Sequence, residues 1–107
     1  MPKDFTTISA VWRKGFFTTG SDPDLWRKDE CGAWMSRSEY GRIESRYGWA
    51  IGRIDPNGDD SVENLRPLQW GNYESKIEGR LNCGVTARGT RNVQARTSDI
   101  IPKNKSS

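Results

Sequence analysis

Hydrophobic and polar positions follow a regular pattern only near the middle of this chain. Trp49, Ile51 and Ile54 are separated by mostly small or polar residues, and this spacing predicts a strand that ends at an Asp-Pro-Asn-Gly turn. A second extended segment is predicted over 64–68, and Pro67 favours a place at the edge or end of a sheet. Two strands joined by a polar loop are therefore expected.

A helix is predicted after the second strand. No proline interrupts the segment from Trp70 to about Glu78, Ile77 falls seven positions after Trp70, and Gly79 provides a stop. The order strand, loop, strand, helix is thus expected over about residues 47–79. A less regular apolar group upstream predicts a short turn or helix, followed by a strand near 33–36.

The two ends of the chain lack periodicity. Residues 1–24 combine turn-forming residues with isolated apolar ones and are expected to form an irregular lead-in. Residues 88–107 are expected to form a flexible basic tail. Between them, residues 25–87 are predicted to form one small α+β domain, because 107 residues suffice for a single domain with a limited core.

Charge is distributed unevenly. Residues 80–107 hold six basic side chains and one acidic side chain, a net charge of +5, so the remaining residues carry −2 of the total +3. This asymmetry favours an arm that binds a polyanion, although a solubilising terminus gives the same composition. The candidate nucleic-acid-binding residues of this arm are Arg80, Arg88, Arg91 and Arg96.

No apolar run approaches the length of a membrane span and no signal-peptide pattern is present, so a cytoplasmic protein without membrane contact is expected. Cys31 and Cys83 match no metal-binding pair and are interpreted as buried thiols; a redox-dependent link is the alternative if they meet in space. The five tryptophans are expected to build the core, in preference to a base-stacking platform.

Three segments carry a family signature, namely 47–56, 64–70 and 72–76. Together they resemble the HNH endonucleases, a family built on a ββα-metal (His-Me) finger, whose first strand reads roughly G-W-E-x-D-H-I-x-P. Segments around the finger are similar to those of small stand-alone bacterial members, so the resemblance extends over about residues 25–92. It implies an α+β fold organised around such a finger.

The resemblance also shows which chemistry is missing. In the family, an Asp on the first strand ligates a divalent metal, the following His deprotonates a water, and a helical Asn or His is a further ligand. The matching positions here hold Gly52, Arg53 and Tyr73, and the chain contains no histidine. Arginine stays protonated, glycine offers no side-chain ligand and tyrosine is a poor Mg²⁺ ligand. We therefore expect no catalytic residues, no metal, no cofactor and no nuclease activity.

Other positions keep the family pattern. By resemblance, Asn64 would brace the loop between the strands, Trp49 and Trp70 would belong to the scaffold, and Lys76 matches a lysine frequent in the family.

The substituted positions leave alternatives open. Arg53 could bind a phosphate, brace the empty pocket with Asp55 or another carboxylate, or contact a protein partner. Tyr73 could pack beside Trp70 or stack on a base.

Three functions follow as expectations. The first is an inactive HNH-like protein that binds the phosphate backbone of DNA or RNA through Arg53, Lys76 and the basic arm. The second is a protein-interaction module or inhibitor, of a phage type, that reuses the inactive fold. The third is a residual nuclease in which Asp55, Asp59 or Asp60 replaces the lost base; for this acidic loop a solvated turn is preferred over a cation site.

Overall fold

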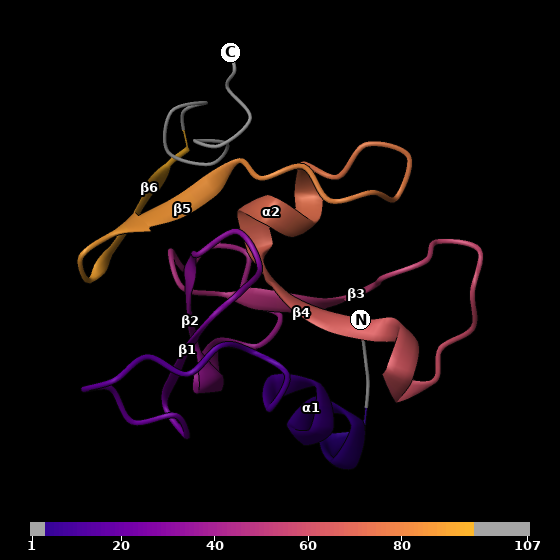
Figure 1. The fold of residues 1–107 in the computed structure, drawn as a ribbon, viewed down its shortest axis with the longest axis horizontal. Helices are drawn as coiled ribbons and strands as arrows, with labels where there is room; N and C mark the ends of the chain where they lie inside the picture. The colour runs from indigo at the N-terminus through magenta and orange to yellow at the C-terminus, as the bar shows by residue number, and fades with distance from the viewer. Residues whose placement is uncertain (1–3, 96–107) are drawn as a thin grey trace.

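The computed structural model describes residues 4–95, which form two short α-helices and three antiparallel pairs of strands (Figure 1). This arrangement confirms the predicted α+β class. The strand pairs are β1 (Trp26–Lys28) with β2 (Trp34–Ser36), β3 (Trp49–Arg53) with β4 (Leu65–Gln69), and β5 (Val85–Arg88) with β6 (Arg91–Gln94). The helices are α1 (Phe5–Trp12) and α2 (Trp70–Glu74), with 3₁₀ turns η1 (Arg37–Glu39) and η2 (Val62–Asn64).

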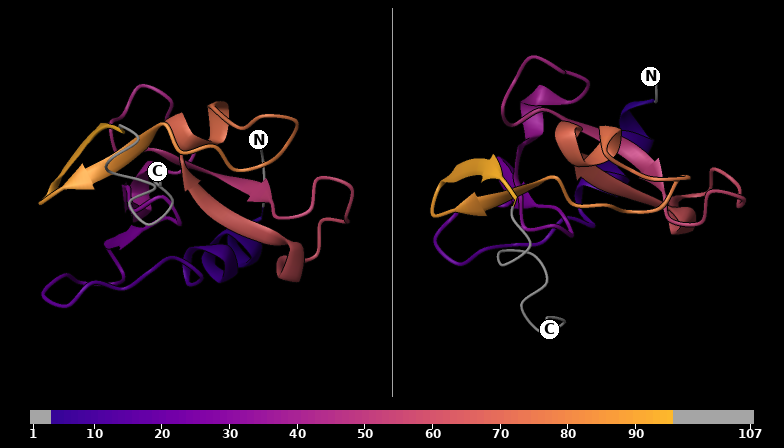
Figure 2. Two further views of the ribbon diagram at one scale, coloured as in Figure 1. Left: turned by 45° about the horizontal axis from the view of Figure 1, so that its top comes forward. Right: turned by 90° about the horizontal axis from the view of Figure 1, so that it is seen from above.

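The β3–β4 hairpin is the centre of the structure, and the two helices flank it (Figures 1 and 2). Trp49 pairs with Gln69 at one end and Arg53 pairs with Leu65 at the other. Because side chains alternate along a strand, Trp49 and Ile51 face the α1 side, and Gly52 faces α2. The helix α2 starts directly after β4, so strand, loop, strand and helix follow in the expected order.

The N-terminal segment differs from the prediction of an irregular lead-in, because residues 5–12 form α1. The Asp4 carboxylate caps this helix by accepting a hydrogen bond from the Thr7 N–H at 2.7 Å. Val11 and Trp12 lie in the buried core. The turn-forming residues Thr6 and Thr7 occupy the first helical turn, where polar side chains are tolerated next to a strong N-cap.

The helix α2 is shorter than predicted, since it ends at Glu74 instead of about Glu78. A tight turn replaces its last part: Ile77 and Arg80 form a β-bridge, and Glu78 and Gly79 have φ angles of 53° and 77°. Two consecutive residues with positive φ are typical of a two-residue hairpin turn. The stop that Gly79 was expected to provide is therefore part of a turn beyond the helix.

The C-terminal segment also differs in part from the prediction. Residues 88–94 belong to the β5–β6 hairpin, which turns at Gly89, so they are not part of a flexible tail. This hairpin is fixed to the rest of the domain by Asn92, which accepts from the Trp34 N–H at 2.7 Å and donates to the Trp34 carbonyl at 2.8 Å. The remainder of the predicted tail, including Arg96, lies outside the described residues.

The apolar core lies between α1 and the β3–β4 hairpin. The rings of Trp12 and Trp49 are 5.2 Å apart between centroids, and both residues are 0% exposed. Tyr40 packs against Trp49 from a loop, with centroids 5.0 Å apart. The core is completed by Val11, Met35, Ile51 and Leu65. Two of the five tryptophans thus form its centre, which explains how a mostly polar chain folds.

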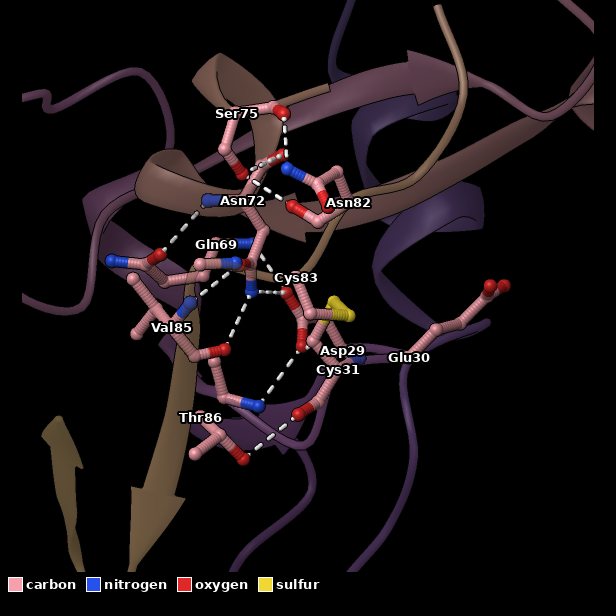
Figure 3. The surroundings of a disulfide bond; sticks show 12 residues. Asp29, Glu30, Cys31, Gln69, Asn72, Ser75, Asn82, Cys83, Val85 and Thr86 are labelled. Atoms are coloured by element: carbon pink, nitrogen blue, oxygen red, sulfur yellow. Dashed lines mark hydrogen bonds between the residues drawn. A yellow bond between two sulfur atoms is a disulfide. The ribbon is translucent and has the colours of Figure 1, made fainter. Parts of the chain in front are cut away.

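Cys31 and Cys83 form a disulfide bond, so the interpretation of both residues as buried thiols is wrong (Figure 3). The turn after β1 and the segment before β5 bring the two residues together, and their separation in the sequence gives no sign of this. Disulfides are typical of oxidising compartments; the cytoplasmic location stays a prediction. Over residues 4–95, no helix is long and apolar enough to cross a lipid bilayer.

A buried polar cluster lies beside the disulfide (Figure 3). The Asp29 carboxylate accepts four hydrogen bonds, each 2.9 Å long, from the N–H groups of Cys31, Ala33 and Gln69 and from the Asn72 side chain. Asn72, which is 0% exposed, also accepts from Gly84 and Val85. Burial raises the pKa of Asp29, and these hydrogen bonds oppose the rise. The cluster joins β1, α2 and β5.

Candidate functional site

An open pocket lies between the end of β3 and α2, with a volume of about 410 Å³. Four of the residues singled out in the sequence meet there, from different elements. Gly52 and Arg53 end β3, Tyr73 belongs to α2, and Lys76 follows this helix. The other lining residues are Ile51, Pro56, Asp60, Leu65 and Gly79.

Gly52 leaves room for the Lys76 ammonium group. A Cβ atom at position 52 would lie 3.2 Å from Lys76 Nζ and 3.3 Å from Leu68 Cδ1, which is closer than ordinary van der Waals contact. The backbone of Gly52 is paired within the sheet opposite Arg66, and Gly52 is not among the glycines with a positive φ angle. The glycine therefore leaves space for the Lys76 side chain, and its backbone angles do not require a glycine.

The Lys76 ammonium group faces this pocket, and no carboxylate of residues 4–95 forms an ion pair with it. Its contact among the described residues is the face of the Tyr73 ring, with Nζ 4.3 Å from the ring centroid. Burial lowers the pKa of Lys76, and the nearby Arg66 guanidinium lowers it further. Arg66 itself forms an ion pair with Glu30 at 2.8 Å. Lys76 is therefore a cation that is partly shielded from water and is open to an anion from outside.

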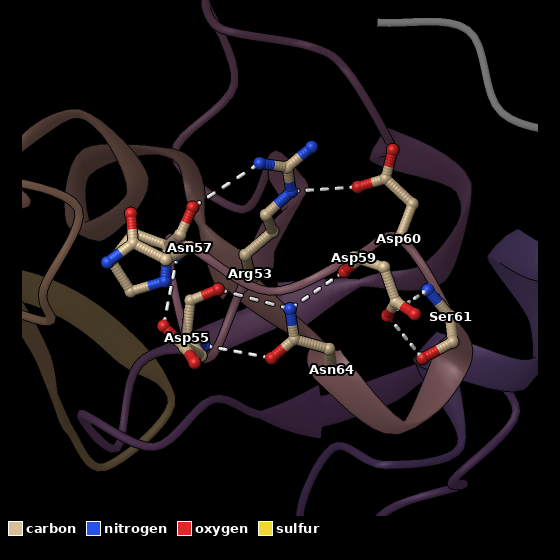
Figure 4. A network of polar contacts seen from close by, with 8 residues as sticks. Arg53, Asp55, Asn57, Asp59, Asp60, Ser61 and Asn64 are labelled. Carbon is tan, nitrogen blue, oxygen red and sulfur yellow. Dashed lines mark hydrogen bonds and ion pairs between the residues drawn. The ribbon is translucent and has the colours of Figure 1, made fainter.

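Arg53 lies at the mouth of the same pocket and is held by the loop between β3 and β4 (Figure 4). Its Nε–H donates to Asp60 at 2.8 Å, and one terminal nitrogen donates to the Pro56 carbonyl at 3.4 Å. The hydrogen bond and charge of Asp60 raise the pKa of Arg53. Of the three roles considered for Arg53, the structure contains the brace, formed with Asp60 instead of Asp55.

Asn64 holds both ends of this loop together (Figure 4). Its side-chain oxygen accepts from the Asp55 N–H at 2.9 Å, and its side-chain nitrogen donates to the carbonyls of Asp55 and Asp59 at 3.1 and 2.7 Å. These contacts match the bracing role that the resemblance gives to this position. The loop therefore has a defined shape where it borders the pocket.

The three aspartates of the loop all have partners in the loop or at the end of β3. Asp55 accepts from the Asn57 N–H, Asp59 accepts from the N–H and hydroxyl of Ser61, and Asp60 pairs with Arg53. Within the described range 4–95, no group of three or more His, Cys, Asp or Glu side chains is arranged to hold a metal ion. The loop carboxylates thus stabilise turns of the loop.

The aromatic residues singled out by the sequence have different places. Trp49 is buried in the apolar core, whereas Trp70 packs at the start of α2 against Tyr73, with ring centroids 5.4 Å apart. Tyr73 therefore packs beside Trp70 and, at the same time, forms one wall of the pocket. Packing and a contact with a ligand are compatible for this residue.

The remaining basic residues do not join the pocket. Arg80 is exposed in the turn next to it, and Arg88 and Arg91 face each other at the end of the β5–β6 hairpin. Arg96 lies outside the described residues. The predicted set is thus divided between one pocket, one turn and one hairpin.

Sequence reasoning missed two features around the site. The first is the buried pair of Asp29 and Asn72, which fixes α2 and hence the position of Tyr73. The second is Asp60 as the partner of Arg53. Neither is visible as a pattern, because Asp29 and Asn72 come from separate segments and Asp60 reaches Arg53 only through the fold of the loop between β3 and β4.

Comparison of this chain with protein-family models, with curated proteins and with solved structures finds no match.

Proposed function

We propose that this protein is a catalytically inactive, HNH-like nucleic-acid-binding domain that contacts the phosphate backbone and does not cleave it. The proposal combines the sequence resemblance of the β3–loop–β4–α2 segment with the chemistry of its pocket. The positions that would hold the metal ligand and the base are Gly52 and Arg53, and neither side chain can supply that chemistry.

The observation that carries the proposal is the open pocket with Lys76 facing it. An ammonium group that has no carboxylate partner within residues 4–95 and lies next to the Arg53 guanidinium group is suited to a phosphate. Arg53 keeps donors beyond its bonds to Asp60 and Pro56, since a guanidinium group has five N–H bonds. Two cations of the domain would therefore approach one phosphate or two neighbouring ones.

Residual nuclease activity receives less support from the same contacts. A general base needs a group that titrates near neutral pH and reaches a water. Asp60 lines the pocket but is paired with Arg53, and Asp55 and Asp59 hold the turns of the loop. The alternative bases considered from the sequence are thus engaged in structural contacts.

A second candidate function, binding of a protein partner, is favoured by one observation. Three large apolar side chains between α1 and β1 are exposed: Phe16 at 55%, Phe17 at 58% and Leu25 at 55%. Exposed apolar residues that gather in one segment are typical of interaction surfaces. None of these three residues lines the pocket, so the two functions make different predictions.

The test is the salt dependence of binding to a fluorescent oligonucleotide, measured by anisotropy for a single strand and for a blunt duplex. Lys76→Gln should weaken both and lower the slope of log affinity against log salt by about 1. Gly52→Asp should have a similar effect, because its carboxylate would lie beside Lys76. Arg53→Gln should have a smaller one, since Asp60 already neutralises part of its charge.

Arg13→Gln is the matched control, because it removes one exposed positive charge just after α1, on the opposite side of the hairpin. Removal of residues 96–107 tests the basic arm separately. Absence of binding by the wild type at low salt, or equal effects of Lys76→Gln and Arg13→Gln, would reject the proposal and favour the protein partner.

A further inference from the structure

A second pocket, distant in sequence from the first, lies between the β1–β2 hairpin and the turn of the β5–β6 hairpin. Its volume is about 420 Å³, within the range of small-ligand sites. Three aromatic residues line it together with Ser21 and Thr90, namely Trp26, Trp34 and Tyr47. The proposed phosphate contacts do not involve this pocket.

The aromatic walls are held in defined orientations. The Trp26 ring is nearly perpendicular to Trp34, at 86°, and to Tyr47, at 90°, with centroids 6.3 and 5.3 Å apart. The Trp34 Nε1–H donates to the Gly89 carbonyl at 2.7 Å, which fixes this ring against the β5–β6 turn. The walls are therefore preorganised for a flat, apolar group.

Polar groups at this pocket point to the class of ligand. The Trp26 Nε1–H makes no hydrogen bond with the described residues and is not buried, so it is available as a donor. Lys28 shares a face of β1 with Trp26, and its ammonium group lies 4.8 Å from the centroid of the Trp34 ring. No carboxylate lines the pocket. A positively charged ligand would therefore meet Lys28 without a compensating acidic group.

We propose that this pocket binds one unstacked nucleobase of a single strand, with Lys28 contacting the adjoining phosphate. A base offers a flat π-face to the aromatic walls and an acceptor to the Trp26 N–H. The inference rests on the proposed function and deepens it, because it assigns an unpaired strand as the preferred form of nucleic acid. The Lys76 pocket would bind the phosphate backbone of single strands and of duplexes alike. The aromatic pocket would bind only an unpaired base, so it would favour the single strand.

The first measurement uses the indole N–H signals of the full chain in ¹H–¹⁵N spectra. Adenosine monophosphate should shift the Trp26 signal in a saturable manner, and ribose 5-phosphate, which lacks the base, should not. The signals of the buried Trp12 and Trp49 serve as internal references. A shift caused equally by both compounds, or by tetramethylammonium but not by the nucleotide, would overturn the proposal.

The second measurement compares a single strand with a blunt duplex of the same length. Trp26→Leu should weaken binding of the single strand by about 5- to 150-fold, the range for loss of one stacked base, and leave the duplex unchanged. Lys28→Gln keeps all three rings and should weaken the single strand less. Phe17→Leu is the matched control, since it removes an exposed aromatic ring elsewhere.

The outcomes separate the two proposals. Equal losses for single strand and duplex in a folded Trp26→Leu variant would reject the base pocket while the phosphate site stands. A saturable nucleotide shift at Trp26 in a protein that binds neither oligonucleotide would reject both the proposed function and the binding of a strand, and would leave the pocket as a site for a free nucleotide. If Trp26→Leu does not fold, Lys28→Gln and the nucleotide titration of the wild type decide the question.

Discussion

On the α1 side of the β3–β4 hairpin, the contacts are made by buried aromatic rings, and Trp12 and Trp49 are both 0% exposed. On the α2 side, the buried groups are a carboxylate and an amide, Asp29 and Asn72, next to the disulfide. The first side tolerates small shifts of its rings, whereas hydrogen bonds on the second side require defined positions. The candidate phosphate pocket borders α2, the helix whose position the polar cluster fixes.

The largest loss of stability is expected from a change on the α1 side of the hairpin. Trp49→Ala should lower the free energy of unfolding by about 3–5 kcal/mol, because it removes a ring that contacts both Trp12 and Tyr40. Urea unfolding followed by circular dichroism measures the loss. A small domain has little stability in reserve, so a variant that is unfolded without denaturant also fits this expectation. A loss below about 1 kcal/mol would contradict it.

Removal of the disulfide should have the next largest effect. The double change Cys31→Ser and Cys83→Ser should cost about 2–4 kcal/mol, because the bond closes a long loop of the unfolded chain. Reduction of the wild type should lower its stability by a similar amount and should leave the double variant unchanged. Equal stability of oxidised and reduced wild type would contradict the expectation.

Asn72→Asp tests the polar side with almost no change of shape. The new carboxyl group would face Asp29 across the present 2.9 Å hydrogen bond, and two such groups share one proton. The pKa of the pair should rise, so the variant should lose about 2–3 kcal/mol near neutral pH and regain part of it as the pH falls. Stability measured against pH for both proteins checks this sign; a variant that weakens further in acid would contradict it.

The smallest effect on stability is expected at Lys76. Its lowered pKa means that burial of the charge opposes folding, and this cost disappears as the pH rises through the folded pKa toward the ordinary value of 10.5. Lys76→Gln should therefore change stability by less than about 0.5 kcal/mol at neutral pH while it weakens nucleic-acid binding. Thermal unfolding measures the change in stability. A clear destabilisation would assign Lys76 a structural role.

The strands β3 and β4, the loop between them and the start of α2 were predictable from the sequence alone. Alternation around Trp49 and Ile51 and the turn after Ile54 depend on neighbouring residues, and they predicted β3, its loop and β4 closely. The α+β class and the start of α2 followed from the same local signals. The positions Gly52, Arg53, Tyr73 and Lys76 were also named from the sequence, and they line one pocket.

The first helix, the disulfide and the polar pairs became visible only in the folded structure. The helix α1 depends on a cap at Asp4 and on burial of Trp12, and its eight residues are too few to show a helical period. The pair Arg53 and Asp60 depends on how the loop after β3 folds back toward that strand. The Cys31–Cys83 bond and the contact of Asp29 with Asn72 join residues from separate segments. Spacing along a chain reports local periodicity, whereas such pairs form only after the hairpins have packed, because the hydrogen bonds and charges involved are gained at contact distance.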